Sequence, residues 1–435
     1  MKRIAVLGTG YVGLVSGSGF AEFGHEVTCL DINEEKIKDL NKGLIPIYEP
    51  GLKSLVSKNV NDKRLKFSSN IDSVIRQSRI IFIAVGTPQS EDGRADLSSI
   101  KSVVQTIINN LNSYKIICTK STVPVGTGEW INTKISEKHS NDKFDYVSNP
   151  EFLREGSAVN DFLFPDRVVI GASSKKAFDE MKNVYRPLYI NKTPLMEFSV
   201  VSAEMIKYAA NSFLALKISY INEIANLCEA VGADVHDVAS AMGKDGRISS
   251  KFLHPGPGFG GSCFPKDIEA LYAIGKEKDI NLNTISATIG ANKFQKQRTL
   301  NKILKLMGDE IKGKKIAILG LSFKPNTDDI RESPSIFIIS SLIALKAQIN
   351  AYDPVANSNF KELYPNINYF DNWKDCSRDA DACVVMTEWN EFRGIDLEEL
   401  KRLLNSPTLL DAKNIFSIKK LKSLEFKYDN VGRNF

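Results

Sequence analysis

The sequence predicts an α/β protein in which two doubly wound domains are joined by a long central helix and a helical middle domain. Three observations lead to this fold class. Apolar strand-like runs alternate with helical stretches in the N-terminal part, one uninterrupted helical pattern begins at Val200, and a second strand–helix–strand unit begins near residue 314. Alternating strands and helices are typical of parallel sheets. A chain of 435 residues can form several cores, and we expect domains at 1–199, 200–300 and 301–435.

The first domain opens with the pattern strand, glycine turn, helix, strand. "RIAVLG" is a short apolar run of the kind that is buried on both faces of a parallel sheet. "GTGYVGLVSGSGFAEFG" follows as a helix rich in small residues, and "HEVTCLD" is the next strand. Further apolar runs at 80–88, 115–122 and 168–172 extend the predicted sheet.

The middle of the chain predicts one long helix. From Val200 to about Ala230, apolar residues recur at helical spacing without a proline, and a glycine follows near the end. About 30 residues of helix span about 45 Å, which is longer than one domain needs. We therefore expect the helix to link two domains and its remaining apolar surface to form a dimer interface. A helix buried inside a single domain is the alternative.

A second α/β unit begins with "KKIAILG". Its first predicted strand ends at Gly320, a loop and a helix follow, and "INAYDP" is a second strand that ends at Asp353. This order repeats that of the opening unit, but the GxGxxG motif is absent.

Composition narrows the classes of function. Apolar residues make up 43% and charged residues 25%, the net charge is +5, and no basic run concentrates on one predicted face. We expect neither a nucleic-acid partner nor a membrane partner. No apolar run approaches the roughly 18 residues of a membrane span, and the N-terminus enters a strand instead of a signal peptide. Six cysteines without a CxxC pair predict no disulfide framework and no metal site, which favours the cytoplasm.

"GTGYVG" places Gly8, Gly10 and Gly13 in the GxGxxG register, with Tyr11 and Val12 between them. Glycines at these positions let the chain turn tightly and bring its backbone close to a pyrophosphate, which rests on the helix N-terminus. Because the motif follows a strand and opens a helix, it predicts a Rossmann-like dinucleotide site.

Further residues are expected around the dinucleotide. Asp31 ends the second strand, 18 residues after Gly13. Its carboxylate would accept hydrogen bonds from a ribose diol and repel a 2′-phosphate, so we expect NAD and not NADP. Lys36 could contact the same adenosine. Thr87 and Thr122 follow later strands and should border the cofactor, because ligands bind beyond the carboxyl ends of parallel strands.

The candidate nucleophile is a cysteine in the glycine-rich loop "GFGGSCFPKD". A thiolate at Cys263 would attack an aldehyde, and an ammonium such as Lys207 would favour the thiolate and stabilise the oxyanion. Asn211, four residues after Lys207, could donate a second hydrogen bond. A carboxylate such as Asp267 or Glu151 is then needed to activate water against a thioester. Taken alone, such a cysteine is more often structural, and a Lys–Asn pair is more often part of a solvated helix face.

Eight blocks stand in order along nearly the whole chain: "GTGYVGL", "FAEFGHEVTCLDIN", "PIYEPGL", "KSTVPVGT", "NPEFLREGSAVNDFLFPDRVVIG", "EMIKYAANSFLALKISYINE", "GPGFGGSCFPKD" and "FKPNTDDIRESPS". Together they resemble the UDP-glucose/GDP-mannose dehydrogenase family of nucleotide-sugar dehydrogenases.

The resemblance implies an NAD-dependent, four-electron oxidation of UDP-glucose at C6 to UDP-glucuronate, with two NADH formed and a role in polysaccharide biosynthesis. It implies that Cys263 attacks the intermediate aldehyde, that the thiohemiacetal is oxidised to a thioester, and that water cleaves the thioester. By the same resemblance, the first domain binds NAD, the middle domain serves dimerisation and the C-terminal domain binds the UDP-sugar.

Individual roles also follow from the resemblance. Lys207 and Asn211 match oxyanion-stabilising positions, and Asp267 matches the carboxylate that orders Lys207 and water. Glu151 matches the general base for hydrolysis, and Thr122 helps to hold the catalytic water.

Binding positions follow in the same way. The implied NAD contacts, beyond those expected above, are Glu155, Lys266 and Arg331. The implied sugar-nucleotide contacts are Glu151, Phe152, Leu153, Arg154, Lys207, Asn211, Arg247, Phe252, Leu253, His254, Pro255, Gly256, Gly260 and Lys324. Arg247 matches an arginine that often reaches the partner subunit's site, which fits a homodimer or a higher homo-oligomer.

Other functions stay open at this point. The substrate could be GDP-mannose or a UDP-N-acetylhexosamine. A two-electron hydroxyacid dehydrogenase also presents a Lys and an Asn at this spacing on a helix, and it would not need Cys263. A nucleotide-binding module without catalysis is the third class.

Overall fold

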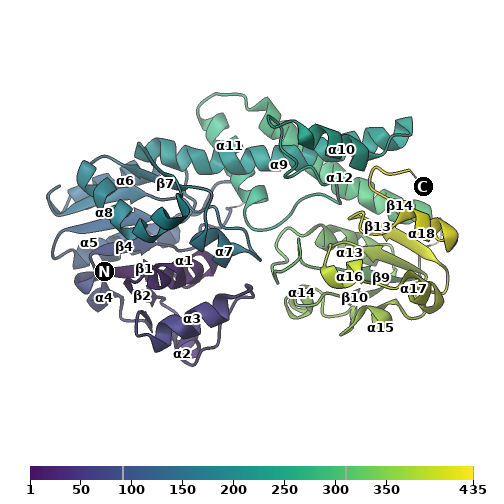
Figure 1. The fold of residues 1–435 in the computed structure, drawn as a ribbon, viewed down its shortest axis with the longest axis horizontal. Helices are drawn as coiled ribbons and strands as arrows, with labels where there is room; N and C mark the ends of the chain where they lie inside the picture. Colours follow the sequence, from purple (N-terminus) through teal and green to yellow (C-terminus); the bar gives the residue numbers. More distant parts are fainter. Residues whose placement is uncertain (91–92, 309–310, 435) are drawn as a thin grey trace. The chain divides into compact units, whose positions relative to one another are not determined.

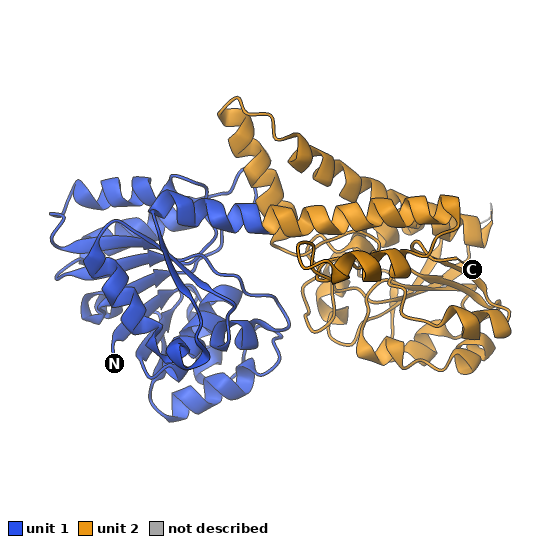
Figure 2. Cartoon of the chain, turned by 45° about the horizontal axis from the view of Figure 1, so that its top comes forward, with its two compact units in different colours: residues 1–210 blue, residues 211–435 orange. Residues whose placement is uncertain are grey.

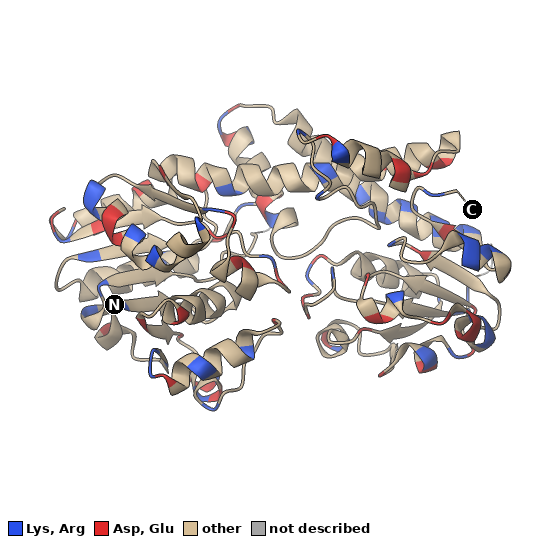
Figure 3. Ribbon diagram, viewed as in Figure 1, with Lys and Arg blue, Asp and Glu red and all other residues tan. Residues whose placement is uncertain are grey.

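The structure is a computed structural model that describes residues 1–90, 93–308 and 311–434. It divides into two compact units, Met1–Ala210 and Asn211–Phe435 (Figure 2). The finer division at 199 and 300 stays a prediction. Across the described residues, every helix is too short or too polar to span a lipid bilayer. Basic and acidic residues are interspersed along the elements of each unit (Figure 3).

Unit 1 contains an eight-stranded sheet in the order β3-β2-β1-β4-β5-β6-β7-β8 (Figure 1). Its strands are β1 (Arg3–Leu7), β2 (Glu26–Leu30), β3 (Leu65–Ser68), β4 (Ile80–Ile83), β5 (Lys115–Thr119), β6 (Phe144–Ser148), β7 (Val168–Ala172) and β8 (Leu195–Phe198). Its helices are α1 (Tyr11–Glu22), α2 (Glu34–Asn41), α3 (Leu52–Asn61), α4 (Ile71–Gln77), α5 (Ser98–Asn110), α6 (Thr127–Ser136), α7 (Ala158–Leu163), α8 (Lys175–Val184) and the 3-10 helix η1 (Arg186–Asn191).

The central strands of unit 1, such as β1 and β4, are largely apolar because the sheet is buried on both faces there. Ile4 and Val6 of β1 belong to the core on one face, whereas Ala5 and Leu7 belong to the core on the other. Strands β1 to β6 are parallel and follow the order of a Rossmann fold. Strand β7 runs antiparallel to β6, so the parallel sheet that the sequence predicts is reversed over its last two strands.

Helix α9 (Val200–Val231) has 32 residues, which confirms the predicted long helix. It runs without interruption through the boundary between the two units.

Unit 2 contains a six-stranded parallel sheet in the order β11-β10-β9-β12-β13-β14. Its strands are β9 (Lys315–Leu319), β10 (Gln348–Tyr352), β11 (Asn368–Tyr369), β12 (Ala382–Val385), β13 (Thr408–Asp411) and β14 (Lys427–Asn430). Its helices are α10 (Val235–Lys244), α11 (Phe264–Glu277), α12 (Asn283–Met307), α13 (Pro334–Ala344), α14 (Asn357–Leu363), α15 (Trp373–Ser377), α16 (Asn390–Arg393), α17 (Leu397–Leu403) and α18 (Ile418–Ser423). The strand order repeats that of β1 to β6, which confirms the second Rossmann-like domain.

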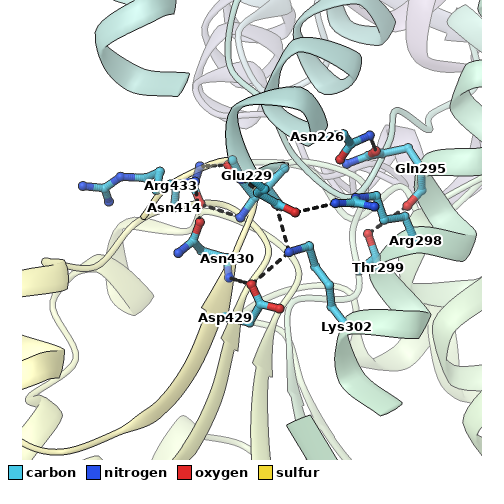
Figure 4. Close-up of polar contacts among 12 residues, drawn as sticks. Asn226, Glu229, Gln295, Arg298, Thr299, Lys302, Asn414, Asp429, Asn430 and Arg433 are labelled. Carbon is cyan, nitrogen blue, oxygen red and sulfur yellow. Dashed lines mark hydrogen bonds and ion pairs between the residues drawn. The ribbon is translucent and has the colours of Figure 1, made fainter. Parts of the chain in front are cut away.

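An ionic network holds the helical part of unit 2 to its sheet (Figure 4). The carboxylate of Glu229, on α9, forms ion pairs with Arg298 at 2.5 Å and with Lys302 at 2.9 Å, both on α12. It also accepts the backbone N–H of Gly432 at 2.8 Å. Lys302 in turn pairs with Asp429 of β14 at 2.9 Å. The C-terminal strand is therefore tied to α9 and α12 by one carboxylate and one ammonium.

Candidate active site

The predicted dinucleotide turn has the geometry that its glycines allow. Gly8 has a φ of 102°, and a Cβ on Gly13 would lie 1.9 Å from the carbonyl oxygen of Gly8. Gly10 is the N-cap of α1, and among the described residues no heavy atom lies within 4 Å of the place where its Cβ would stand. A side chain at Gly13 would therefore clash with the backbone of the turn, whereas the space beside Gly10 at the helix N-terminus can receive a pyrophosphate.

Asp31 lies beside this turn at the end of β2. Its Oδ2 accepts hydrogen bonds from the backbone N–H and the hydroxyl of Thr9, at 3.1 and 2.5 Å, and lies 3.3 Å from Lys36 Nζ. Burial raises the pKa of Asp31, but the hydrogen bonds from Thr9 and Asn33 and the charge of Lys36 outweigh burial and lower it overall. The carboxylate is therefore ionised at neutral pH and available to a ribose diol.

Thr87 and Thr122 meet where β4 and β5 end. The hydroxyl of Thr87 donates to the carbonyl oxygen of Thr122 at 2.8 Å. The structure thus brings these two predicted residues together at the carboxyl edge of the sheet, as the topology requires.

In unit 2, the carboxylate at the position that corresponds to Asp31 has protein donors as its partners. Asp353 ends β10, as Asp31 ends β2, but it is buried and its Oδ2 accepts the backbone N–H groups of Leu321 and Ser322 and the indole N–H of Trp389. Its Oδ1 accepts two further backbone N–H groups. Since protein donors engage this carboxylate, Asp353 is not free to accept hydrogen bonds from a ribose as Asp31 is.

A buried ion pair joins two of the predicted catalytic residues in unit 1. Lys207 Nζ lies 2.9 Å from Glu151 Oε1 and 2.7 Å from the Glu151 carbonyl oxygen, and both side chains are about 5% exposed. The other carboxylate oxygen accepts the backbone N–H of Leu153 at 2.5 Å. The ammonium of Lys207, on α9, is therefore held against the loop that follows β6.

Lys120 lies in the same region, and the sequence analysis did not single it out. Its buried ammonium contacts Asn149 Oδ1 at 3.2 Å and the hydroxyl of Tyr185 at 3.4 Å. Burial lowers the pKa of Lys120 to about 8. The charges of Glu151 and Lys207 also act on it, so it contributes to the electrostatics of the ion pair.

The loop after Glu151 carries the predicted substrate residues. The guanidinium of Arg167 lies 3.9 Å from the ring centroid of Phe152. Arg154 Nη2 pairs with Asp161 at 2.5 Å. Leu153 packs on the core between α1 and the sheet. These contacts fix the conformation of the loop residues 152–154.

The candidate nucleophile lies in unit 2. Cys263 is the N-cap of α11 and is partly exposed. Asp267, one turn further along, is buried and accepts the side-chain N–H of Asn211 at 2.6 Å and the ammonium of Lys266 at 2.6 Å. Helix N-termini stabilise negative charge. The structure therefore brings Cys263, Lys266, Asp267 and Asn211 together around the first turn of α11.

Buried amide side chains hold the glycine-rich loop that leads to Cys263. Asn292 of α12 accepts the N–H of Phe259 at 2.8 Å and donates to its carbonyl at 3.1 Å. Asn222 of α9 accepts the N–H of Gly256 at 2.8 Å, and Gln295 donates to the carbonyl of Gly256 at 2.8 Å. A Cβ on Gly260 would lie 2.3 Å from the carbonyl oxygen of Glu332, so the loop requires glycine there.

The predicted substrate residues 252–255 differ in burial and in neighbours. Leu253 is buried in the core between α9, α10 and Val431, whereas His254 is exposed and Pro255 is buried. Phe252 packs near Phe264 with ring centroids 6.1 Å apart.

Besides Lys266, three predicted cations of unit 2 have described neighbours of their own. Arg247 is 90% exposed and pairs with Asp245. Arg331 pairs with Asp329 at 2.8 Å, and Lys324 Nζ lies 5.4 Å from the ring centroid of Phe323. Their assignment to NAD or substrate stays a prediction.

The glycine turn, the acidic strand end and the two Rossmann-like domains define a dinucleotide-linked oxidoreductase. Comparison with known proteins gives its family. Residues 2–189 match the NAD binding domain of the UDP-glucose/GDP-mannose dehydrogenase family, residues 201–294 match its central domain and residues 317–418 match its UDP binding domain.

Full-length relatives agree with these matches. The chain is 49% identical over 436 residues to the UDP-glucose 6-dehydrogenase TuaD of Bacillus subtilis (strain 168), covering 100% of this chain and 94% of that protein. It is 46% identical to a UDP-glucose 6-dehydrogenase of Rhizobium meliloti (strain 1021), with 99% of each covered. The fold is similar to a UDP-glucose dehydrogenase from Pyrobaculum islandicum, with a TM-score of 0.92, 33% identity, and 100% of this chain and 98% of that chain covered.

A structure of a UDP-D-ManNAc dehydrogenase from Pyrococcus horikoshii is also similar, with a TM-score of 0.88, 26% identity and 99% of each chain covered. The chain belongs to the UDP-glucose/GDP-mannose dehydrogenase family, and NAD is its cofactor. The residues that would hold NAD are those of the glycine turn, with Asp31 and Lys36.

Proposed function

We propose that this protein oxidises UDP-glucose at C6 to UDP-glucuronate in two NAD-dependent steps that pass through a thioester at Cys263. One observation carries the chemistry: Cys263 stands at the N-cap of α11, one turn before the buried carboxylate of Asp267. A two-electron dehydrogenase needs no nucleophile at this place, whereas an aldehyde oxidation does.

Sequence similarity supports UDP-glucose as the sugar nucleotide. Relatives named UDP-glucose 6-dehydrogenase are 40–49% identical over nearly the whole chain. Structures of UDP-N-acetyl-mannosamine dehydrogenases are 25% identical at a TM-score of 0.81. A GDP-mannose dehydrogenase structure is 28% identical at a TM-score of 0.55.

The proposed reaction divides into two oxidations and a hydrolysis. NAD, held by the glycine turn with Asp31 and Lys36, would supply the hydride acceptor for both oxidations at C6. The first oxidation converts the alcohol to an aldehyde, and the Cys263 thiolate adds to the aldehyde carbon to give a thiohemiacetal. The second oxidation removes a hydride and a proton from the thiohemiacetal and gives a thioester. Water then adds to the thioester carbon, the C–S bond breaks, and the carboxylate leaves as the thiolate is restored.

The side chains have distinct roles in this proposal. The ammonium of Lys207 and the amide of Asn211 stabilise the oxyanion that forms on C6 when the thiol or water adds. Glu151 takes the proton of the attacking water, with Thr122 helping to hold that water. Asp267 holds the Asn211 amide at 2.6 Å, which orients its donor.

The test of the proposed function is the yield of NADH per UDP-glucose consumed. We expect a yield near two for the wild type and no net formation of acid by Cys263→Ser. Cys228→Ala, which removes a buried thiol of α9, is the matched control and should keep the yield of two. A yield of one with an unaffected Cys263→Ser would contradict the thioester route. Turnover of GDP-mannose or a UDP-N-acetylhexosamine but not of UDP-glucose would contradict the choice of substrate.

We also propose a homodimer, or a larger homo-oligomer, that works in the cytoplasm. Apolar side chains exposed along α9 support self-association, as argued in the Discussion. The six cysteines, all within the described ranges, form no disulfide, which is the usual state in a reducing compartment.

A further inference from the structure

We infer that Glu49 is a positioning residue that ties the substrate loop after β6 to the cofactor turn, so that NAD binding orders that loop. The inference rests on the proposed function and adds a residue to it. Glu49 lies in "PIYEPGL", a block to which the reaction above assigns no role.

The contacts of Glu49 join three segments that are remote in the sequence. Its carboxylate is buried, and Oε2 accepts the hydroxyl of Tyr11 and the backbone N–H of Gly156 at 2.6 Å. Oε1 accepts the N–H of Ala158 at 2.7 Å and, more weakly, that of Val159 at 3.4 Å. A buried carboxylate with this set of donors is stable in one arrangement only, because losing a donor leaves a charge without compensation.

The two segments that Glu49 contacts belong to predicted sites. Tyr11 is the first residue of α1 and lies inside the GxGxxG motif. Gly156 directly follows Glu155, a predicted NAD contact, and closes the loop that begins at Glu151. The loop is thus held at one end by the pair of Glu151 with Lys207 and at the other end by Glu49.

Tyr11 is the link between the carboxylate and the cofactor turn. Its hydroxyl donates to Glu49 and accepts the N–H of Gly156 at 3.1 Å. Burial, the hydrogen bond to Glu49 and the charges of Glu49 and Glu155 all raise the pKa of Tyr11, so its hydroxyl stays a donor at any physiological pH.

Helix packing makes the link rigid. Phe162 at the end of α7 packs edge-on against Phe20 of α1, with ring centroids 5.0 Å apart. Helix α7 is thus attached to α1 at one end by Phe162 and at the other end through Glu49 and Tyr11. A dinucleotide that fixes the first turn of α1 therefore also restrains residues 153–159.

Hydrogen exchange with and without NAD tests the inference on the full-length protein. We expect saturating NAD to slow exchange of the amides of residues 153–159 in the wild type, and to do so much less in Glu49→Gln and in Tyr11→Phe. Gln keeps the size of the side chain but replaces one acceptor oxygen by a donor that faces Gly156. Tyr48→Phe removes a hydroxyl from the neighbouring, partly exposed residue and is the matched control, for which exchange should follow the wild type.

Kinetics give the second readout. We expect Glu49→Gln to lower kcat for UDP-glucose about tenfold or more, because a shift of about 1 Å in a positioning loop costs that much. The dissociation constant for NAD should change less than about threefold, since the described hydrogen bonds of the Glu49 carboxylate go to Tyr11 and to residues 156–159 and not to Gly8, Gly10 or Gly13. The double variant with Tyr11→Phe should be little worse than Glu49→Gln alone, because both remove the same link.

Two results would overturn the inference: NAD-dependent protection of 153–159 that is unchanged in Glu49→Gln, or losses in kcat that multiply in the double variant. Failure of the proposed function gives a different pattern. If the protein does not oxidise UDP-glucose, the exchange experiment with NAD still reports on the link. Tyr11→Phe, which removes one oxygen atom, keeps the test valid if Glu49→Gln fails to fold.

Discussion

At the scale of single residues, the pair of Lys207 and Glu151 serves both stability and the proposed chemistry. Both side chains are almost fully buried. Removing one partner of a buried ion pair leaves the other charge uncompensated, which costs about 3–5 kcal/mol. We expect Lys207→Met to lower the free energy of unfolding by about this amount and to abolish UDP-glucose oxidation, as measured by urea denaturation and NADH formation.

The double variant Lys207→Met, Glu151→Gln should recover most of the stability but none of the activity. The matched control is Lys175→Met, which removes the lysine of the exposed ion pair with Asp179 and should change stability by less than about 0.5 kcal/mol. If Lys207→Met is as mild as Lys175→Met, the buried pair does not have the energetic role described here.

The sequence predicts the residues whose role depends on the local backbone. It does not reveal residues whose hydrogen-bond partners are remote along the chain. Gly10 and Asp31 are predictable because the GxGxxG motif and its spacing to the next strand place them just after the adjacent strands β1 and β2. Glu49 and Asn292 are not, because a polar residue in a loop or on a helix most often faces solvent. Their partners, the N–H groups of Gly156 and Phe259, are 107 and 33 positions away. Periodicity carries no information on such pairs.

At the scale of helices and strands, α9 docks on unit 1 through a carboxylate as well as through Lys207. Glu204 is buried and accepts the backbone N–H groups of Gly126 and Gly128, both at 2.7 Å, where α6 begins. Since Thr122 lies on the loop before α6, this carboxylate connects α9 to the edge of the sheet that is predicted to border the cofactor. The place of Lys207 thus depends on how α9 is docked.

This docking should depend on pH. Burial raises the pKa of Glu204 to about 7, above the value near 4.5 of an exposed glutamate, although two N–H donors oppose the effect. Between these pH values the folded state binds more protons than the unfolded state, so stability falls as pH rises. We expect the free energy of unfolding of the wild type, relative to Glu204→Gln, to fall by about 1–3 kcal/mol from pH 5 to pH 8.

Urea denaturation at pH 5, 6, 7 and 8 measures this difference. The matched control is Glu34→Gln, in the exposed first turn of α2, whose stability relative to the wild type should show no such slope. A flat difference for Glu204→Gln would mean that the two N–H donors hold the carboxylate ionised at all these pH values.

The elements themselves are largely predictable from hydrophobic pattern. Strands buried on both faces, such as β1 and β9, are short apolar runs, and α9 has apolar residues at helical spacing over 32 residues. The direction of β7 is not predictable in this way, because a buried strand has the same composition in a parallel and in an antiparallel pair. Direction depends on the path of residues 149–167, whose turns and short helix α7 the pattern does not resolve.

At the scale of the whole molecule, two domains with the same strand order differ at the carboxyl ends of their first two strands. In unit 1, Gly10 leaves space at the N-terminus of α1 and Asp31 can reach a ribose. In unit 2, Asp353 is saturated by protein donors, including Trp389. The family match agrees, since it places NAD binding in residues 2–189 and UDP binding in residues 317–418. One strand order thus supports two nucleotide sites because the turn after the first strand differs.

Exposed apolar side chains on α9 support self-association of the chain. Phe213, Tyr220 and Leu227 are spaced seven residues apart, so they lie along one stripe of the helix with a drift of only about 20° per step. They are 61%, 45% and 58% exposed. Covering such apolar area gains about 25 cal/mol per Å², and a second copy presents the same stripe across a twofold axis.

We expect the wild type to elute with twice the mass of the chain or a higher multiple in size-exclusion chromatography with light scattering, and Tyr220→Asp and Leu227→Asp to elute as monomers. A charge at the centre of an apolar interface would be buried without a partner, which a marginal contact cannot tolerate. Tyr189→Asp is the matched control, because Tyr189 is 86% exposed on η1 of unit 1. A monomeric wild type, or a dimer that survives both aspartates, would show that copies of this chain do not meet along α9.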